Sequence, residues 1–168
     1  MSEPTVRAVP ITPERFAPYG DVICASPDMK DAMNEARFDR FSKLAMVDVD
    51  TRGGGAPSIS IARCTTATTL PYRFDLVERH PLGSQAFIPL SPFRFFVVVA
   101  PAGEAVECEE LCAFVTNGSQ GVNYHKGVWH MPMIGLEEGQ EFLIVDRSGD
   151  SENCEEHYFG EPVTLLGQ

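Results

Sequence analysis

Short runs of β-forming residues, separated by glycines and prolines, make up most of the chain. Residues 93–100 are almost continuously apolar, which is the pattern of a strand buried on both faces. Residues 73–80 alternate between apolar and polar side chains, as a strand with one buried face does. The other predicted strands cover residues 5–11, 21–24, 44–49, 58–64, 111–115, 121–133 and 141–145. Many short strands at a spacing of roughly 8–12 residues predict an all-β sandwich or barrel.

Three segments depart from the strand pattern. Residues 12–16 begin with Thr12 and Pro13, a capping residue followed by proline at the first helical position, and predict a short helical turn. Residues 28–41 are polar and irregular, and they predict a partly helical excursion. Residues 50–55 are rich in glycine and predict a flexible loop, because no strand-then-helix context supports a phosphate-binding loop.

Composition and charge exclude some classes of protein function. The chain has 168 residues, of which 43% are apolar, so we expect residues 1–168 to form one domain with a proper core. The formal net charge of −11 argues against a nucleic-acid-binding protein, which would need a basic surface. A small anionic substrate would need nearby arginine or lysine side chains to reverse the local field.

The sequence predicts a soluble, cytoplasmic protein. Its first residues lack the basic and apolar regions of a signal peptide, and no apolar run approaches the ~18–20 residues that span a bilayer. The five cysteines form an odd set without regular spacing. We therefore expect buried, reduced thiols and a reducing compartment.

Histidine is concentrated in two distant segments. Residues 78–90 and 116–130 together contain three of the four histidines and the single tryptophan. Histidine transfers protons near neutral pH and binds transition metals more often than other side chains do. The concentration predicts one site that is built from two distant parts of the chain.

Strand alternation predicts which side chains of these segments face each other. If residues 72–80 form one strand, Glu78 and His80 share its inward, apolar face. In the second segment, Tyr124, Lys126 and His130 share one face, and His125 lies on the other. A single histidine on such a face is more often structural than functional. For His80 and His130 together, each beside a charged residue, we favour a functional interpretation.

Parts of both segments resemble the motifs of cupins, a family of small double-sheet β-barrels. The second cupin motif is P-x-G-x-x-H, and residues 125–130 keep its glycine and final histidine but replace its proline. The first motif is H-x-H followed by a carboxylate. Here His80 and then Gln85 are in place, and Glu78 stands where the other histidine would be.

A closer resemblance is to the ureidoglycolate lyase family, which has the cupin fold. Residues 79–90 and 113–130 resemble its signature segments, and weaker matches at residues 16–23, 59–63 and 142–147 keep the same order. The resemblance implies a mainly all-β, cupin-like double-sheet β-barrel with a few short helices, which forms a homodimer. It also implies a carbon–nitrogen lyase that cleaves (S)-ureidoglycolate into glyoxylate and urea in allantoin degradation, within purine and nitrogen metabolism.

The resemblance also suggests a metal site. By cupin position, the candidate ligands are His80, Gln85 and His130, with help from Glu78. The family suggests nickel, and two histidines with an amide oxygen form a weaker ligand set than the usual cupin site of three histidines and a carboxylate. A metal-free site, with His80 and His130 as acid and base, is the competing interpretation.

The reaction of ureidoglycolate assigns further roles. Its hydroxyl proton must be removed and the leaving urea nitrogen must be protonated. We expect Glu78 or His130 to take the hydroxyl proton and Lys126 to add positive charge. Arg63 is the candidate clamp for the substrate carboxylate, and Tyr124 is a candidate donor to the substrate. The structural alternatives are a surface ion pair for Arg63, a solvated side chain for Lys126 and core packing for Tyr124.

One position departs from the family. A second histidine commonly follows the one that matches His130, and here Met131 takes its place. Alternation puts Met131 on the face opposite His130, where a role in the core or in a dimer contact survives the change and a role as a ligand would not.

Two other functions fit parts of the pattern. A ureidoglycolate amidohydrolase would release ammonia and carbon dioxide, but the sequence shows no clear spacing of a metal pair for this chemistry. A non-catalytic cupin that binds small acids is favoured by the degenerate metal motif, since a fold alone does not fix a function.

Overall fold

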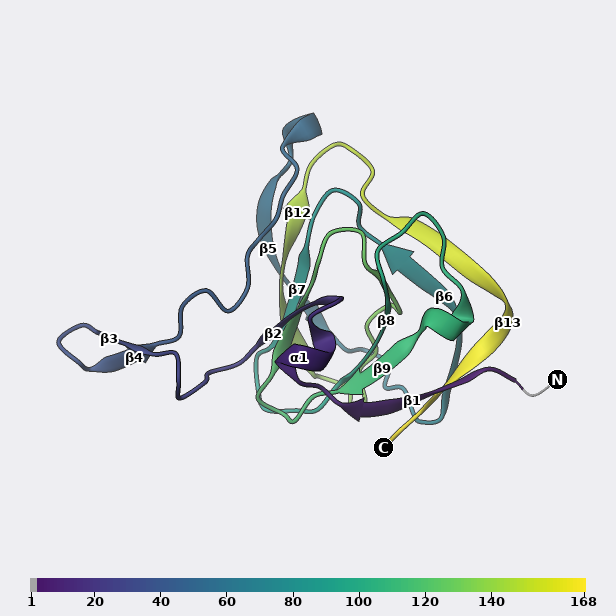
Figure 1. The fold of residues 1–168 in the computed structure, drawn as a ribbon, viewed down its shortest axis with the longest axis horizontal. Coiled ribbons are helices and arrows are strands. Elements are labelled where there is room, and N and C mark those ends of the chain that lie inside the picture. The colour runs from purple at the N-terminus through teal and green to yellow at the C-terminus, as the bar shows by residue number, and fades with distance from the viewer. Residues whose placement is uncertain (1–2) are drawn as a thin grey trace.

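The computed structural model describes residues 3–168 and is built almost entirely from β-strands (Figure 1). Six strands close into a barrel, in the order β1 (Thr5–Pro10), β13 (Glu155–Leu166), β6 (Tyr72–Arg79), β11 (Trp129–His130), β8 (Phe96–Ala100) and β9 (Cys112–Val115). Five strands form a second sheet, in the order β2 (Gly20–Ile23), β10 (Gly121–Tyr124), β7 (Gln85–Pro89), β12 (Glu141–Ser148) and β5 (Ala56–Arg63). The expected cupin-like double-sheet β-barrel is confirmed.

The helical segments are short. Helix α1 (Pro13–Phe16) begins after Thr12, whose side chain accepts a hydrogen bond of 3.2 Å from the backbone N–H of Arg15, as the capping pattern predicted. Two 3-10 turns, η1 (Arg52–Gly54) and η2 (Cys108–Glu110), lie in loops. Within residues 3–168, no helix has both the length and the apolar character needed to span a membrane.

Strand β8 separates two apolar cores. Phe96, Val98 and Ala100 face the interior of the barrel, whereas Val97 and Val99 belong to a second cluster that also contains side chains of the five-stranded sheet. All five residues of β8 are buried. The prediction of a strand buried on both faces is confirmed, and the second cluster holds the barrel against the other sheet.

Strand β6 does not keep the uninterrupted alternation that the sequence predicted. Phe74 and Val77 are three residues apart, yet both belong to the core of the barrel. The pairing of β6 with β13 slips between these positions, because Tyr158 lies opposite Leu76 and Val163 lies opposite Phe74. Glu78 therefore points away from the barrel core, on the face opposite Val77.

Residues 121–133 are not the continuous strand that we predicted. Residues 121–124 form β10 in the second sheet, whereas residues 129–130 form β11 in the barrel. The chain turns between them at Gly127, whose φ of 77° suits glycine better than other residues. The turn is closed by a hydrogen bond of 3.2 Å from the Val128 N–H to the His125 carbonyl. The predicted shared face of Tyr124, Lys126 and His130 does not exist.

Residues 28–41 form a hairpin instead of a partly helical excursion. Strands β3 (Asp31–Met33) and β4 (Phe38–Arg40) pair with each other and project from the body of the molecule (Figure 1). The connecting residues Asn34, Glu35 and Ala36 all have positive φ angles, which a right-handed helix excludes. Every residue of the two strands is exposed.

Other expectations also need correction. Residues 44–49 form no strand, and only Val49 makes an isolated bridge, to Gly83. Strands β7 and β13 were not predicted from the sequence. The five cysteines are free thiols as expected, but they are partly buried or, for Cys154, exposed.

The close approach of β2 and β10 at Gly20 provides a test of the sheet. A Cβ atom at Gly20 would lie 1.9 Å from the backbone oxygen of Asn123, so we expect Gly20→Ala to destabilise the protein by roughly 1–3 kcal/mol or more. Gly160→Ala is the matched control, because a Cβ there meets no atom within 4 Å. Urea unfolding of the two variants measures the difference, and equal stabilities would contradict the packing described.

Candidate active site

The site lies where β11 of the barrel pairs with β6, and it contains two histidines and a glutamate. His130 is the cross-strand partner of Glu78. The His80 and His130 ring centroids are 5.1 Å apart. Glu78 Oε1 lies 3.8 Å from His80 Nε2 and 4.0 Å from His130 Nδ1. The structure thus brings together the two histidines that the sequence placed in distant segments.

His130 is fully enclosed between the two sheets. Its ring stacks on the ring of Tyr124 from β10, with centroids 4.4 Å apart and planes 12° from parallel. His130 Nδ1 lies 3.4 Å from the Met131 carbonyl, which can only accept a hydrogen bond, so Nδ1 carries the proton. His130 Nε2 is buried and makes no hydrogen bond to any described residue. Nε2 therefore carries a buried lone pair without a hydrogen-bond partner among the described residues.

The enclosure keeps His130 neutral. Burial lowers the pKa of His130 to about 3, because the charged imidazolium loses its hydration, and the nearby His80 acts in the same direction. Burial also raises the pKa of Tyr124, and Glu78 adds to this effect. The Tyr124 hydroxyl therefore stays protonated and uncharged beside His130. The two residues come from different sheets, β10 and β11, and not from one strand as predicted.

The residues next to His130 serve the barrel core. Trp129 and Met131 are 4% and 2% exposed, and both belong to the apolar cluster inside the barrel. The predicted packing role of Met131, on the side opposite His130, is confirmed.

His80 is held at both ring nitrogens. Its Nδ1 lies 2.7 Å from the Asn153 carbonyl oxygen, and its Nε2 lies 3.1 Å from Gln85 Oε1. The Gln85 amide nitrogen in turn donates to Asp146 Oδ2 over 3.1 Å. These side chains line a pocket of about 270 Å³, together with Ser84, Arg147, Glu152 and Cys154.

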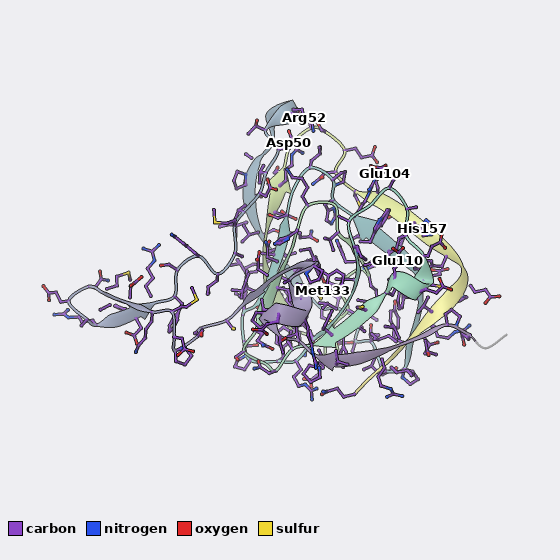
Figure 2. The ribbon with its side chains drawn as sticks, in the orientation of Figure 1. Asp50, Arg52, Glu104, Glu110, Met133 and His157 are labelled. Atoms are coloured by element: carbon purple, nitrogen blue, oxygen red, sulfur yellow. The ribbon has the colours of Figure 1, made fainter. Side chains whose placement is uncertain are left out.

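The charges around the pocket are mainly negative. Glu78, Asp146 and Glu152 contribute carboxylates. Among the described residues that line the pocket, Arg147 is the one arginine or lysine. Its Nε donates to the Asp50 carbonyl over 2.8 Å, and a second guanidinium nitrogen donates to the Arg52 backbone carbonyl. Figure 2 shows Asp50 and Arg52 together in the loop at the edge of the second sheet. An anionic substrate would therefore need a further source of positive charge.

Lys126 and Arg63 lie outside this pocket. Lys126 is in the turn before β11, 3.1 Å from Asp48, and it lines a neighbouring pocket that shares Ser84 with the first. Arg63 is exposed at the end of β5, where its guanidinium lies 2.6 Å from Glu141. Glu141 is five residues from Asp146 along β12, or about 17 Å for an extended strand. The structure does not place Arg63 beside the histidines, and its predicted role as a clamp stays a prediction.

The remaining histidines are also apart from the site. His125 is half-exposed and lies 3.0 Å from Asp21, so its predicted separation from His130 is confirmed. His157 lies on β13, at the opposite side of the molecule from β5, and packs edge-on against Phe159 (Figure 2).

Three residues that touch the site were not predicted from the sequence. Asp146 bonds to Gln85, Asn153 holds His80, and the Cys154 thiol donates to Glu78 Oε2 over 3.6 Å. Burial and the Glu78 charge raise the pKa of Cys154 to about 11, so it remains a thiol. Residues 142–147 resembled a family segment, which was the available signal for Asp146. The loop of Asn153 and Cys154 carried no periodic pattern.

The donor atoms present suit a divalent metal. Glu78, His80 and His130 offer ligand atoms that all lie within 4.8 Å of one another. Two imidazoles and a carboxylate are a common ligand set for divalent transition metals. Two further features fit such a site. His130 Nε2 is buried without a hydrogen-bond partner among the described residues, and His80 Nδ1–H faces a backbone carbonyl, as in many metal-bound histidines. Gln85 Oε1, one of the predicted ligands, lies next to His80 Nε2.

Comparisons with known proteins agree on one family. The family model described as ureidoglycolate lyase matches residues 3–166. The chain is 47% identical to a ureidoglycolate lyase of Pseudomonas fluorescens (strain Pf0-1), over 96% of both chains. It is 46% identical to ureidoglycolate lyases of Pseudomonas syringae pv. syringae (strain B728a), over 94% of this chain and 91% of the relative, and of Pseudomonas aeruginosa (strain LESB58), over 96% and 95%.

The burial of neutral His130 predicts a pH dependence of stability. The unfolded chain binds a proton at this histidine below about pH 6.5, whereas the folded chain does so only near pH 3. The free energy of unfolding should therefore fall as the pH decreases from about 6.5 towards 3. His130→Phe keeps an aromatic ring stacked on Tyr124. It should reduce the slope of the free energy of unfolding against pH.

Urea unfolding between pH 3.5 and pH 7.5, in buffer with a metal chelator, measures this change. The range includes the pKa of a free histidine, which is about 6.5. Tyr124→Phe is the control, because it keeps the ring that stacks on His130 and removes no group that titrates in this pH range. An identical slope for His130→Phe and the wild-type protein would show that His130 is not held neutral.

Proposed function

The chain belongs to the ureidoglycolate lyase family, and we propose that it cleaves (S)-ureidoglycolate into glyoxylate and urea at the site of Glu78, His80 and His130. The observation that carries the proposal is the contrast between the two histidines. One is buried and neutral with a free lone pair, and the other lines the pocket with both nitrogens facing acceptor oxygens. A base and an acid at adjacent positions are what the elimination requires.

Glu78 or His130 is the base in this proposal. It takes the proton from the substrate hydroxyl group, and the oxygen then forms the aldehyde C=O of glyoxylate. The electron pair of the C–N bond moves to the urea nitrogen, which receives a proton from His80 Nε2. Glu78 Oε1 lies about equally far from both rings, so it stabilises the positive charge on either histidine.

A divalent metal, with nickel as the ion implied by the resemblance, would be held by Glu78, His80 and His130, with the Gln85 oxygen beside them. A bound divalent cation supplies Lewis-acid polarisation of substrate oxygens and positive charge. The mainly negative pocket supports this part of the proposal. The two imidazoles cannot bind a metal and transfer a proton through the same nitrogen. Activity measured after chelation and after addition of nickel distinguishes these two roles.

Lys126 is the better-placed candidate for extra positive charge near the substrate carboxylate. It lines the pocket that adjoins the site at Ser84, whereas Arg63 lies at the far end of the second sheet. Tyr124 is 2% exposed and stacks on the His130 ring, which favours its packing role.

One observation favours the alternative function as a ureidoglycolate amidohydrolase. Glu78 also groups with Cys154 and Glu156, so it belongs to two sets of ligand atoms. A carboxylate shared by two sets is a feature of sites with two metals. The second set is more exposed and contains a protonated thiol, which makes it the weaker site.

We further propose that residues 1–168 act as one catalytic domain in the cytoplasm, in allantoin degradation. The apolar cluster shared by the two sheets supports a single unit, and the free cysteines suit a reducing compartment.

We propose that the protein is a homodimer that associates through the outer face of the second sheet. Ile59 and Ile61 on β5 are 70% and 60% exposed, and they lie beside Val145 and Leu143 of β12. The hairpin of β3 and β4 extends from the same side of the molecule (Figure 1). An isolated hairpin is marginally stable, and an exposed apolar strand favours association.

Incubation of purified protein with ureidoglycolate tests the activity. We expect urea and glyoxylate in equal amounts, and His130→Ala should lower kcat by at least about 100-fold. Nickel added after chelation should raise the rate, because the pocket carries mainly negative charge.

Other products, or activity without metal, would contradict parts of the proposal. Ammonia in place of urea would favour the amidohydrolase, and binding without turnover would favour a non-catalytic cupin. Full activity after chelation would remove the metal from the proposal. Arg73→Ala is the control, because this exposed side chain pairs with Glu3 and has no role in the proposed site.

The proposed dimer contact predicts that Ile59→Asp combined with Ile61→Asp gives a monomer, because two buried charges without partners would oppose association. Analytical ultracentrifugation measures the mass. Tyr158→Asp is the matched control, since Tyr158 is 61% exposed but lies on the barrel strand β13. A monomeric wild-type protein would refute the proposed contact.

A further inference from the structure

The side-chain amide of Gln85 lies between Asp146 and His80. Its Nε2 is 3.1 Å from Asp146 Oδ2, and its Oε1 is 3.1 Å from His80 Nε2. Gln85 and Asp146 come from the neighbouring strands β7 and β12, where Ala86 pairs with Val145. Both side chains are half-buried, so solvent competes only in part with these contacts.

Asp146 determines which end of this amide faces the histidines. A carboxylate can only accept hydrogen bonds, so the NH2 group of Gln85 must be the end that faces Asp146. The amide is planar, and its oxygen therefore points the other way, to His80 Nε2. Without the carboxylate, a half-turn of the amide would exchange its nitrogen and oxygen at little cost.

The orientation matters because the two ends of the amide differ in chemistry. The oxygen accepts a hydrogen bond from His80 Nε2, and it is also the Gln85 atom that can bind a divalent cation. An NH2 group at the same place could do neither. His80 Nδ1 is fixed independently by the Asn153 carbonyl, 2.7 Å away, so the Gln85 oxygen is the variable contact of the ring.

We propose that Asp146 is a positioning residue, which holds the oxygen of Gln85 towards His80 and into the site. Its effect on turnover rests on the lyase function proposed above, whereas the orientation itself does not. Asp146 also lines the pocket, and the role proposed here is its hydrogen bond to Gln85, with no contact to the substrate assigned.

Asp146→Asn is the first test. Asparagine has nearly the shape of aspartate but offers both a donor and an acceptor, so the Gln85 amide is free to turn. We expect kcat for urea release to fall by about 10- to 100-fold, with a smaller change in KM, and nickel affinity of the chelated protein to fall in parallel. Titration calorimetry with nickel chloride measures the affinity.

The double variant Gln85→Glu with Asp146→Asn distinguishes positioning from a structural role. Gln85→Glu alone sets two carboxylates against each other, so it should also lose activity. In the double variant, the new amide on β12 donates to the new carboxylate on β7, whose other oxygen faces His80. We expect this pair to recover most of the loss of either single change, which a simple packing defect would not do.

NMR of the free protein reads the orientation without any substrate. In the wild-type protein, the Gln85 NH2 protons should lie near Asp146, and in Asp146→Asn they should also show contacts to the His80 ring. Asp150→Asn is the control, since it removes an exposed charge four residues after Asp146 in the chain that does not line the pocket. Loss of the wild-type orientation only in Asp146→Asn, with rescue of activity in the double variant, supports the proposal.

Two results would overturn it. One is wild-type kcat together with an unchanged Gln85 spectrum in Asp146→Asn. The other is a double variant that is no more active than either single variant, although it folds as the wild-type protein does. If the wild-type protein released no urea, the lyase function would fail, and the NMR comparison would still decide the orientation.

Discussion

Packing of the barrel against the five-stranded sheet is the constraint on which the site depends. His130 comes from the barrel strand β11 and Tyr124 from β10 in the other sheet, and their rings stack only because the apolar cluster holds the two sheets together. The same contact removes His130 from water. Its neutrality, its low pKa and its free Nε2 all follow from this enclosure.

The position of Glu78 follows from a local irregularity of the same framework. The slip in the pairing of β6 and β13 keeps Val77 in the barrel core and turns Glu78 to the side of His130. The resulting site has carboxylates on several sides in a chain whose formal net charge is −11. A divalent cation held by Glu78, His80 and His130 would supply positive charge near an anionic substrate.

Alternation along single strands was a useful guide where the strands are regular, and it failed where the chain changes sheet. It identified β8 as buried on both faces because eight consecutive residues, 93–100, are almost all apolar. It failed at residues 121–133, because a turn at Gly127 moves the chain from one sheet to the other. Tyr124 and His130 meet across that boundary, which a period of two cannot describe. Lys126, grouped with them by the same rule, lies in the turn and contacts Asp48.

The sequence by itself determined the all-β class, the family resemblance and the pair His80 and His130, because these depend on residue types and short spacings. The tertiary structure decided that Glu78 lies about equally far from both histidines, that Asp146 reaches His80 through Gln85, and that Arg63 is remote. Contacts between residues about 60 or more positions apart in the chain, such as Gln85 with Asp146 or Glu141 with Arg63, depend on strand order and register. Those are properties of the assembled sheets and leave no periodic signal in a single segment.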